Sequence, residues 1–100
     1  MTSSFDIRSD TFAEILNEDS SVEHIATGFA FTEGPIWVDG YLLFSDIPNS
    51  RIVRYHVDEE GASISTYKYP SGNSNGLTLD HDGNLIACEH TNRRVSMTDP

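Results

Sequence analysis

The sequence contains a single cysteine, few basic residues and no long hydrophobic run. Cys88 alone can form neither an internal disulfide nor a multi-cysteine metal site. The sequence has 6 Lys and Arg residues and 16 Asp and Glu residues, which gives a formal net charge of −10. This charge argues against binding to nucleic acid or anionic lipid, because both need a basic protein surface. The chain also lacks an apolar stretch approaching the roughly 20 residues of a membrane span, and the basic and apolar segments of a signal peptide. We therefore expect a cytoplasmic protein that binds neither nucleic acid nor membrane.

Strand patterns dominate the chain after its first 21 residues. Hydrophobic residues make up 37% of the sequence, so its composition permits a folded core. We expect an N-terminal lead over residues 1–21 and a domain over residues 22–100, in which Val22–Thr27 alternates between apolar and polar residues. In a propeller, Val22–Thr27 could instead complete the final blade as its outer strand, and it would then have no partner blade in this sequence. Further strands are predicted over residues 35–38, 41–46, 51–57, 63–69, 76–79, 84–89 and 93–97. The predicted fold class is all-β.

The lead carries one short helical signal. Thr11 and Glu14 have the spacing of a capping box, in which each side chain bonds a free backbone N–H at the start of a helix. Phe12, Ile15 and Leu16 would then form one apolar face over about one and a half turns. We expect this helix to lie against the body of the protein, and a helix that binds a partner is the alternative.

An internal repeat is the most informative feature of the domain. Shifted by 42 or 43 residues, the segment from Gly34 to Val53 matches the segment from Gly76 to Ser96. Both share the pattern Asp-Gly-x-Leu-(Leu/Ile)-x-x-acid-x-x-Asn-x-Arg-(Ile/Val). A period of roughly 40–45 residues with four strands per unit is typical of a β-propeller blade, and a propeller closes with about four to eight blades. The sequence is therefore expected to be the N-terminal portion of a larger propeller, about two blades long and inactive alone.

Glu33 and Asn75 occupy equivalent positions, each directly before the first glycine of its repeat. The first strand of each propeller blade lines the central channel, so both side chains would point toward one axis. A carboxylate and an amide oxygen that converge there suit a hard cation such as Ca²⁺ or Mg²⁺. The alternative is structural, with Glu33 capping a turn and Asn75 tolerating an unusual backbone conformation before Gly76.

The other candidate residues have weaker support. None of the 4 histidines has the short spacing of a zinc-binding pair. His90 stands beside Glu89 near the end of a strand expected to lie next to the channel, and a solvated loop residue is the alternative. Cys88 lies in an apolar strand and is interpreted as a small buried residue. Residues 80–83 lack the spacing of an EF-hand, and a hairpin turn explains them better.

Four segments of the chain carry a family resemblance. They are Phe31–Trp37, Phe44–Ile52, Pro70–Thr78 and Cys88–Val95. Together they resemble the SMP-30/gluconolactonase/LRE family, and the last two are similar to its bacterial gluconolactonase branch. The resemblance covers about residues 22–98. It implies a six-bladed β-propeller with one divalent cation in the central channel, Ca²⁺ first and Zn²⁺ or Mg²⁺ as alternatives, and hydrolysis of a sugar lactone.

The resemblance also implies roles for four residues. Glu33 matches the metal ligand of the family's Glu-Gly-Pro motif, and Asn75 matches an asparagine of the substrate pocket. Glu89 and His90 are expected to contact substrate as well. The remaining metal ligands, an Asn and an Asp that acts as general base, belong to later blades of the family. A non-catalytic propeller that binds a ligand or a protein is the rival interpretation.

Overall fold

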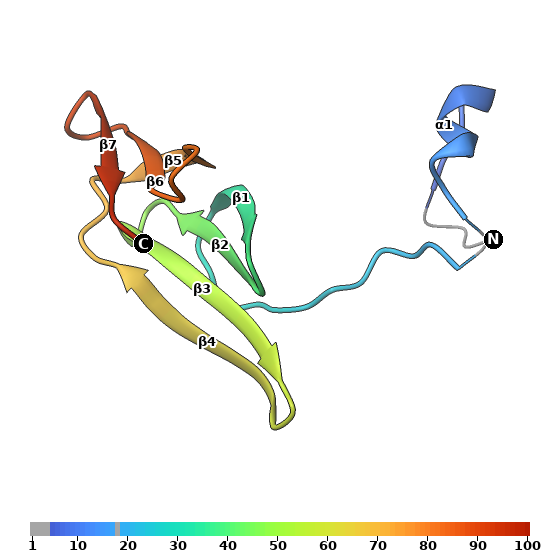
Figure 1. Cartoon of the computed structure of the whole chain (residues 1–100), viewed down its shortest axis with the longest axis horizontal. Coiled ribbons are helices and arrows are strands. Elements are labelled where there is room, and N and C mark those ends of the chain that lie inside the picture. Colours follow the sequence, from blue (N-terminus) through green and yellow to red (C-terminus); the bar gives the residue numbers. More distant parts are fainter. Residues whose placement is uncertain (1–4, 18) are drawn as a thin grey trace.

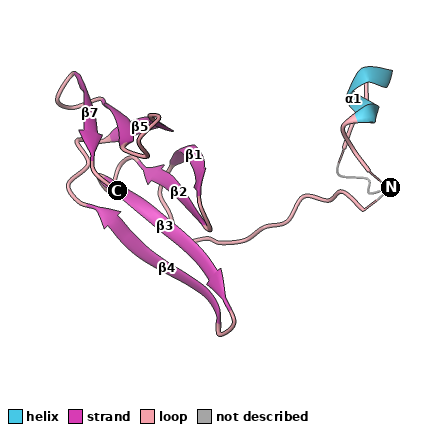
Figure 2. Cartoon of the chain, in the orientation of Figure 1, coloured by secondary structure: helices cyan, strands magenta, loops and turns pink. Residues whose placement is uncertain are grey.

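The structure is a computed structural model that describes residues 5–17 and 19–100, and almost all of its regular structure is antiparallel strand (Figures 1 and 2). The helix α1 (Asp10–Glu14) precedes the strands β1 (Thr32–Val38), β2 (Tyr41–Asp46), β3 (Arg51–Asp58), β4 (Gly61–Lys68), β5 (Ser74–Leu79), β6 (Leu85–Glu89) and β7 (Arg94–Thr98). They form one sheet in the order β1-β2-β3-β4 and a second in the order β5-β6-β7. The prediction of an all-β fold is confirmed, and the observed strands lie within about three residues of the predicted ranges.

The two sheets repeat one another in register as well as in order. Thr32 faces Asp46 across the β1–β2 pair, and Ser74 faces Glu89 across the β5–β6 pair. These pairs are related by the same shift that aligns the two halves of the sequence. The internal repeat is therefore also a structural repeat, and residues matched by sequence occupy matched places in the two sheets.

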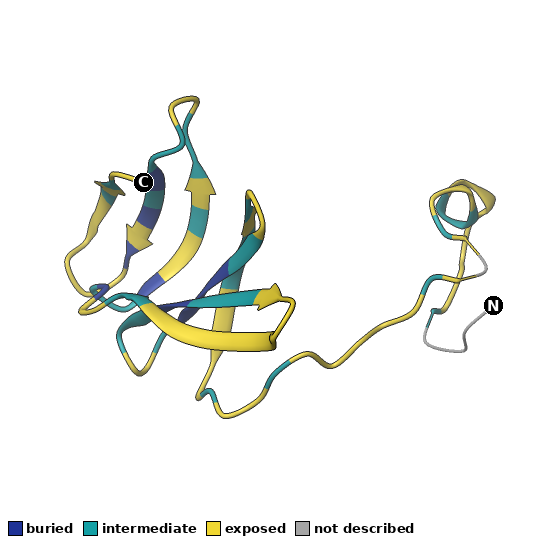
Figure 3. Ribbon diagram, turned by 60° about the horizontal axis from the view of Figure 1, so that its bottom comes forward, coloured by how far each residue is buried: buried dark blue, intermediate teal, exposed yellow. Residues whose placement is uncertain are grey.

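The hydrophobic core lies where the two sheets meet (Figure 3). Leu43 of β2, Ile52 of β3 and Leu85 of β6 are each at most 1% exposed and form one cluster. Leu77 and Leu79 of β5 pack against this cluster from the second sheet. Apolar burial is the main favourable term in folding, so it is this contact that holds β1 and β5 side by side.

The turn chemistry differs between the two repeats. Asp39 and Gly40 form the expected tight turn between β1 and β2, with φ angles of 21° and 100°. The corresponding connection between β5 and β6 is a longer loop, in which the Asp80 carboxylate accepts hydrogen bonds from the backbone N–H groups of Asp82 and Asn84, both at 2.9 Å. This loop joins two antiparallel strands, so residues 80–83 belong to a hairpin, as expected.

The N-terminal lead departs from the prediction. The N-cap of α1 is Ser9 rather than Thr11, because the Ser9 hydroxyl accepts from the Phe12 N–H at 3.1 Å. No residue of α1 is buried and the helix lies away from the sheets, so the expected packing against the body is wrong (Figure 1). An apolar face of so few residues buries too little area to offset the entropy of docking.

In the described part of the chain, none of the helical structure has the length and apolar composition of a membrane span.

The strand predicted over Val22–Thr27 is also absent from this described segment. These residues run as an extended segment toward the first sheet (Figure 1). Alternation of apolar and polar residues gives a strand only where a neighbouring strand completes the backbone hydrogen bonds. The pattern alone was therefore insufficient to predict a strand here.

Candidate functional site

Glu33 and Asn75 lie in irregular stretches near the start of the two inner strands. The pairing of β1 with β2 shifts between Glu33 and Ile36, and the pairing of β5 with β6 shifts between Ser74 and Leu77. Such bulges bend a strand and change the direction of its side chains. The side chains of Glu33 and Asn75 are both exposed, and their strands are neighbours, so the structure leaves both available to a ligand.

Gly34 is the residue that allows the two inner strands to approach. Its φ angle is +61°, and a Cβ atom at this position would overlap the carbonyl oxygen of Asn75 and lie 3.1 Å from the amide nitrogen of Leu77. Only glycine combines a left-handed backbone with this contact at no steric cost. The glycine of the repeat therefore brings the backbone beside Glu33 into contact with Asn75.

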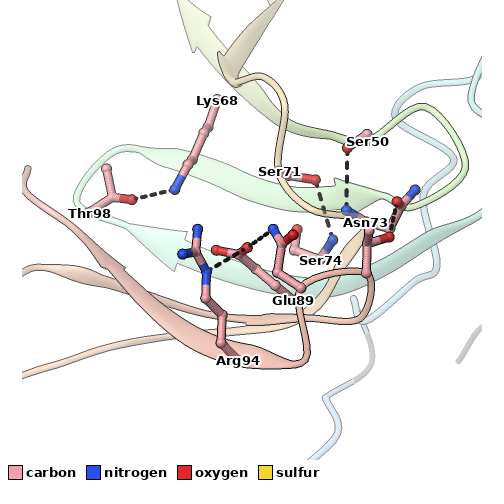
Figure 4. A network of polar contacts seen from close by, with 10 residues as sticks. Ser50, Lys68, Ser71, Asn73, Ser74, Glu89, Arg94 and Thr98 are labelled. Atoms are coloured by element: carbon pink, nitrogen blue, oxygen red, sulfur yellow. Dashed lines mark hydrogen bonds and ion pairs between the residues drawn. The ribbon is translucent and has the colours of Figure 1, made fainter.

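The segment before Asn75 is anchored to the turns at the ends of both sheets (Figure 4). The Ser71 N–H donates to the Ser50 carbonyl at 2.7 Å, and the Asn73 amide donates to the Ile47 carbonyl at 2.7 Å. The Thr91 hydroxyl donates to the Asn73 side-chain oxygen. The sequence carries no local signal for this role of Asn73, because its partners lie 26 and 18 residues away. The left-handed φ angle of 52° at Asn73, directly before a strand, is not evident from the sequence either.

The three residues predicted to contact substrate come together in one groove. Asn75, Glu89 and His90 line it, with Cys88 and Arg93 beside them. Glu33 instead borders an apolar hollow lined by Phe29, Pro35, Leu42 and Phe44. The structure thus gathers three of the four predicted site residues and places Glu33 at the neighbouring strand.

Glu33 and Asn75 have the donor chemistry of a hard-cation site. Both offer exposed side-chain oxygens, and carboxylate and amide oxygens are ligands that Ca²⁺ accepts. One Glu33 carboxylate oxygen accepts from the Gly34 N–H at 3.1 Å, a contact that also fits the structural alternative. Within residues 5–17 and 19–100, no three His, Cys, Asp or Glu side chains gather around one point. A cation held by Glu33 would therefore need ligands in addition to these residues.

The Glu89 carboxylate is held by side chains of its own turn. It is only 4% exposed, and its carboxylate accepts from the Asn92 amide at 2.6 Å and from the Arg94 guanidinium at 3.1 Å (Figure 4). The hydrogen bond from the Asn92 amide is the largest cause that lowers the pKa of Glu89, and the nearby Arg94 guanidinium adds to it, so that the pKa falls to about 2. These contacts give the carboxylate a structural role, and substrate contact by Glu89 stays a prediction.

Asp46 makes the same arrangement one repeat earlier. Its carboxylate accepts from the Asn49 amide at 2.8 Å and lies 3.4 Å from the Arg51 guanidinium nitrogen. It also accepts from the backbone N–H groups of Ala30 and Phe31. Burial opposes ionisation of Asp46, but the hydrogen bonds outweigh it and lower its pKa. We call each acid–Asn–Arg set a turn clasp, and it explains the acid-x-x-Asn-x-Arg part of the repeat.

The turn clasp of Glu89 predicts a pH-dependent stability. The folded pKa of about 2 lies below the 4.5 of an unperturbed Glu, so the ionised carboxylate stabilises the folded state fully only above about pH 4.5, and this contribution is lost as the pH falls toward 2. Glu89→Gln should therefore melt at a lower temperature than wild type at pH 7, and the difference should shrink as the pH falls. Glu59→Gln, in the exposed β3–β4 turn, is the matched control. A difference that persists unchanged to pH 2 would contradict a role for the charge.

Two further sequence interpretations concern exposed residues. Cys88 was interpreted as buried, but it is exposed, because within the described residues no third sheet covers its face of β6. The equivalent position in the first sheet is Ser45, which is 0% exposed under the second sheet. His90 is exposed in the groove beside Asn75, so its contact with substrate stays a prediction.

Comparison with known proteins connects this geometry to one family. Residues 31–100 match the family model of the SMP-30/Gluconolactonase/LRE-like region. The gluconolactonase of Zymomonas mobilis subsp. mobilis is 32% identical over 101 aligned residues, which cover 86% of this chain and 28% of that protein. An X-ray structure of a candidate gluconolactonase superposes with a TM-score of 0.77 and 30% identity, over 91% of this chain and 31% of the other. The chain thus spans less than a third of the length of either relative.

Proposed function

The chain belongs to the SMP-30/gluconolactonase/LRE-like family, and on this premise we propose that the whole protein hydrolyses a sugar lactone to the corresponding aldonic acid. The observation that carries the proposal is the family match over residues 31–100, within which Glu33 and Asn75 lie on neighbouring inner strands. A relative named gluconolactonase, 32% identical, supports the reaction class. The substrate is therefore proposed as a small sugar lactone, with gluconolactone as the first to test.

Glu33 is proposed as a ligand of one divalent cation, with Ca²⁺ first and Zn²⁺ or Mg²⁺ as alternatives. A cation bound there would supply Lewis-acid activation of the lactone carbonyl and of a water molecule. The negative charge of Glu33 would hold it, while the Asn75 amide can both donate to and accept from sugar hydroxyls. His90 borders the same groove as Asn75 and can hydrogen-bond a polar substrate. The general base is expected to be a residue of a later blade of the whole protein, beyond the 100 residues described by this sequence.

The direct test of the function is hydrolysis of glucono-1,5-lactone by the whole protein, measured as acid released at constant pH. Turnover above the spontaneous rate, lost on chelation and restored by Ca²⁺, Mg²⁺ or Zn²⁺, is the expected result. A folded whole protein that gives no turnover with any of these cations would support the rival interpretation of a non-catalytic binding propeller.

Asn75 should matter for substrate more than for metal. In the whole protein, Asn75→Ala is expected to lower kcat/KM for the lactone by about 10-fold or more, because a lost polar contact leaves a sugar hydroxyl unpaired. The Ca²⁺ affinity, measured by titration calorimetry, should change by less than about 2-fold, since a neutral amide contributes little of the charge attraction. Asn84→Ala, in the loop at the opposite end of β5, is the control. An equal loss in both variants would contradict a substrate role for Asn75.

A further inference from the structure

We propose that Ser45 is a positioning residue that fixes the spacing between Glu33 and Asn75. The inference rests on the proposed function, because it takes these two residues as the metal and substrate contacts. Ser45 touches neither ligand in this proposal. It acts through the backbone of the two strands that carry the contacting side chains.

Ser45 is a polar residue in an apolar part of β2. It is 0% exposed, and Leu43, two residues earlier on the same face of the strand, belongs to the hydrophobic core. A buried hydroxyl is costly unless it is hydrogen-bonded. The Ser45 oxygen lies 2.9 Å from the carbonyl oxygen of Asn75 and 3.0 Å from the hydroxyl of Ser74. Its polar partners therefore both come from the segment that carries Asn75.

The direction of these two hydrogen bonds follows from their chemistry. The Asn75 carbonyl can only accept, so the single Ser45 proton is given to it, and the Ser74 hydroxyl donates to Ser45. The bulge in β5 leaves Asn75 without a partner in the β5–β6 register. Ser45 thus supplies a fixed donor where the sheet itself does not pair the residue.

The same serine is tied to Glu33 on its other side. Ser45 and Glu33 are directly opposite in the β1–β2 pair, and Gly34 is packed against the Asn75 carbonyl. One hydroxyl therefore connects the strand position of Glu33 with the peptide group of Asn75. Without it, the start of β5 could shift relative to β1, and a misplacement of about 1 Å can reduce the rate of a catalysed reaction by roughly 100-fold.

The test is Ser45→Ala in the whole protein, with kcat and KM measured for glucono-1,5-lactone. We expect kcat/KM to fall by about 10-fold to 100-fold while the affinity for Ca²⁺ alone changes by less than about 2-fold. A second measurement does not depend on turnover: Ca²⁺ titration with and without D-gluconate. In wild type, gluconate should strengthen Ca²⁺ binding, because both ligands require the same spacing between Glu33 and Asn75. Ser45→Ala should lose this coupling between the two ligands.

Ser71→Ala is the matched control, because Ser71 is 2% exposed and its hydroxyl accepts from the Ser74 N–H, while among the described residues it makes no hydrogen bond to β2 or to Asn75. Ser71→Ala should lower the melting temperature by about as much as Ser45→Ala does. It should leave kcat/KM and the coupling between gluconate and Ca²⁺ binding unchanged. Ser45→Cys keeps a small side chain with a weaker hydrogen-bond donor, so its fall in kcat/KM should be intermediate. This variant replaces Ser45→Ala in the test if Ser45→Ala does not fold.

The outcomes separate the two proposals. An active wild type whose Ser45 variants keep normal kcat/KM and normal coupling, or lose no more than Ser71→Ala, would overturn the positioning role and leave the lactonase proposal standing. A folded wild type that is inactive on lactones with every cation would overturn the proposed function, and the positioning role would fall with it.

Discussion

Replacing Gly34 with alanine should destabilise the protein by about 3 kcal/mol or more, the largest stability effect we expect from a single substitution. Two costs combine at this position. An alanine at a φ of +61° is strained, and its Cβ would overlap the Asn75 carbonyl oxygen. Neither β1 nor β5 can relieve the contact locally, because the atom approached is backbone. The two inner strands would have to separate, which would open the core between the sheets.

Urea unfolding of the whole protein measures this effect. Gly40→Ala is the matched control, since Gly40 has a φ of +100° but a Cβ there meets nothing within 4 Å. The control therefore carries the backbone strain without the collision. If the free energy of unfolding falls by the same amount in both variants, the close approach of the inner strands contributes nothing to the effect of Gly34→Ala.

Glu33→Gln should reduce lactone hydrolysis by the whole protein by orders of magnitude. The substitution keeps the size of the side chain and an oxygen that can accept from the Gly34 N–H, but it removes the charge proposed to hold the cation. The melting temperature without metal should stay near that of wild type, because Glu33 is exposed. Calorimetric Ca²⁺ titration should show a large loss of affinity in the same folded variant.

Glu23→Gln provides the comparison, because Glu23 is an exposed acidic residue of the extended segment before β1 and its substitution makes the same change in charge. It should leave both Ca²⁺ affinity and turnover unchanged. A folded Glu33→Gln variant with wild-type Ca²⁺ affinity would move Glu33 from metal ligand to turn residue. The proposal of a metal-dependent lactonase would then lose its main residue in this chain.

The strands could be predicted from the sequence because their signals are local. Period-two patterns and the Asp39-Gly40 turn depend on neighbours a few residues apart, and the repeat confirmed them a second time. The prediction failed at Val22–Thr27 for the converse reason. That segment has the pattern of a strand, but whether a strand forms is decided by a partner that the sequence does not reveal.

The site was only partly predictable for similar reasons. Glu33 and Asn75 were found through the repeat, which places matched residues at matched positions. The hydrogen bonds that hold Glu89 were not predicted, although an acid followed within five residues by Asn92 and Arg94 is a signal for a local ion pair. Ser45 gave no such signal, because its partners lie 29 and 30 residues along the chain.

The turn clasps also bear on the order in which the protein folds. Asp46 bonds partners 3 and 5 residues away, and Glu89 does the same, whereas Ser45 and Asn75 are 30 residues apart. Closing a short loop costs less entropy than closing a long one, so contacts local in sequence form early. Each sheet can therefore set its own turn before the sheets meet. The spacing between Glu33 and Asn75 depends on the long-range contacts, and it is fixed only when the sheets dock.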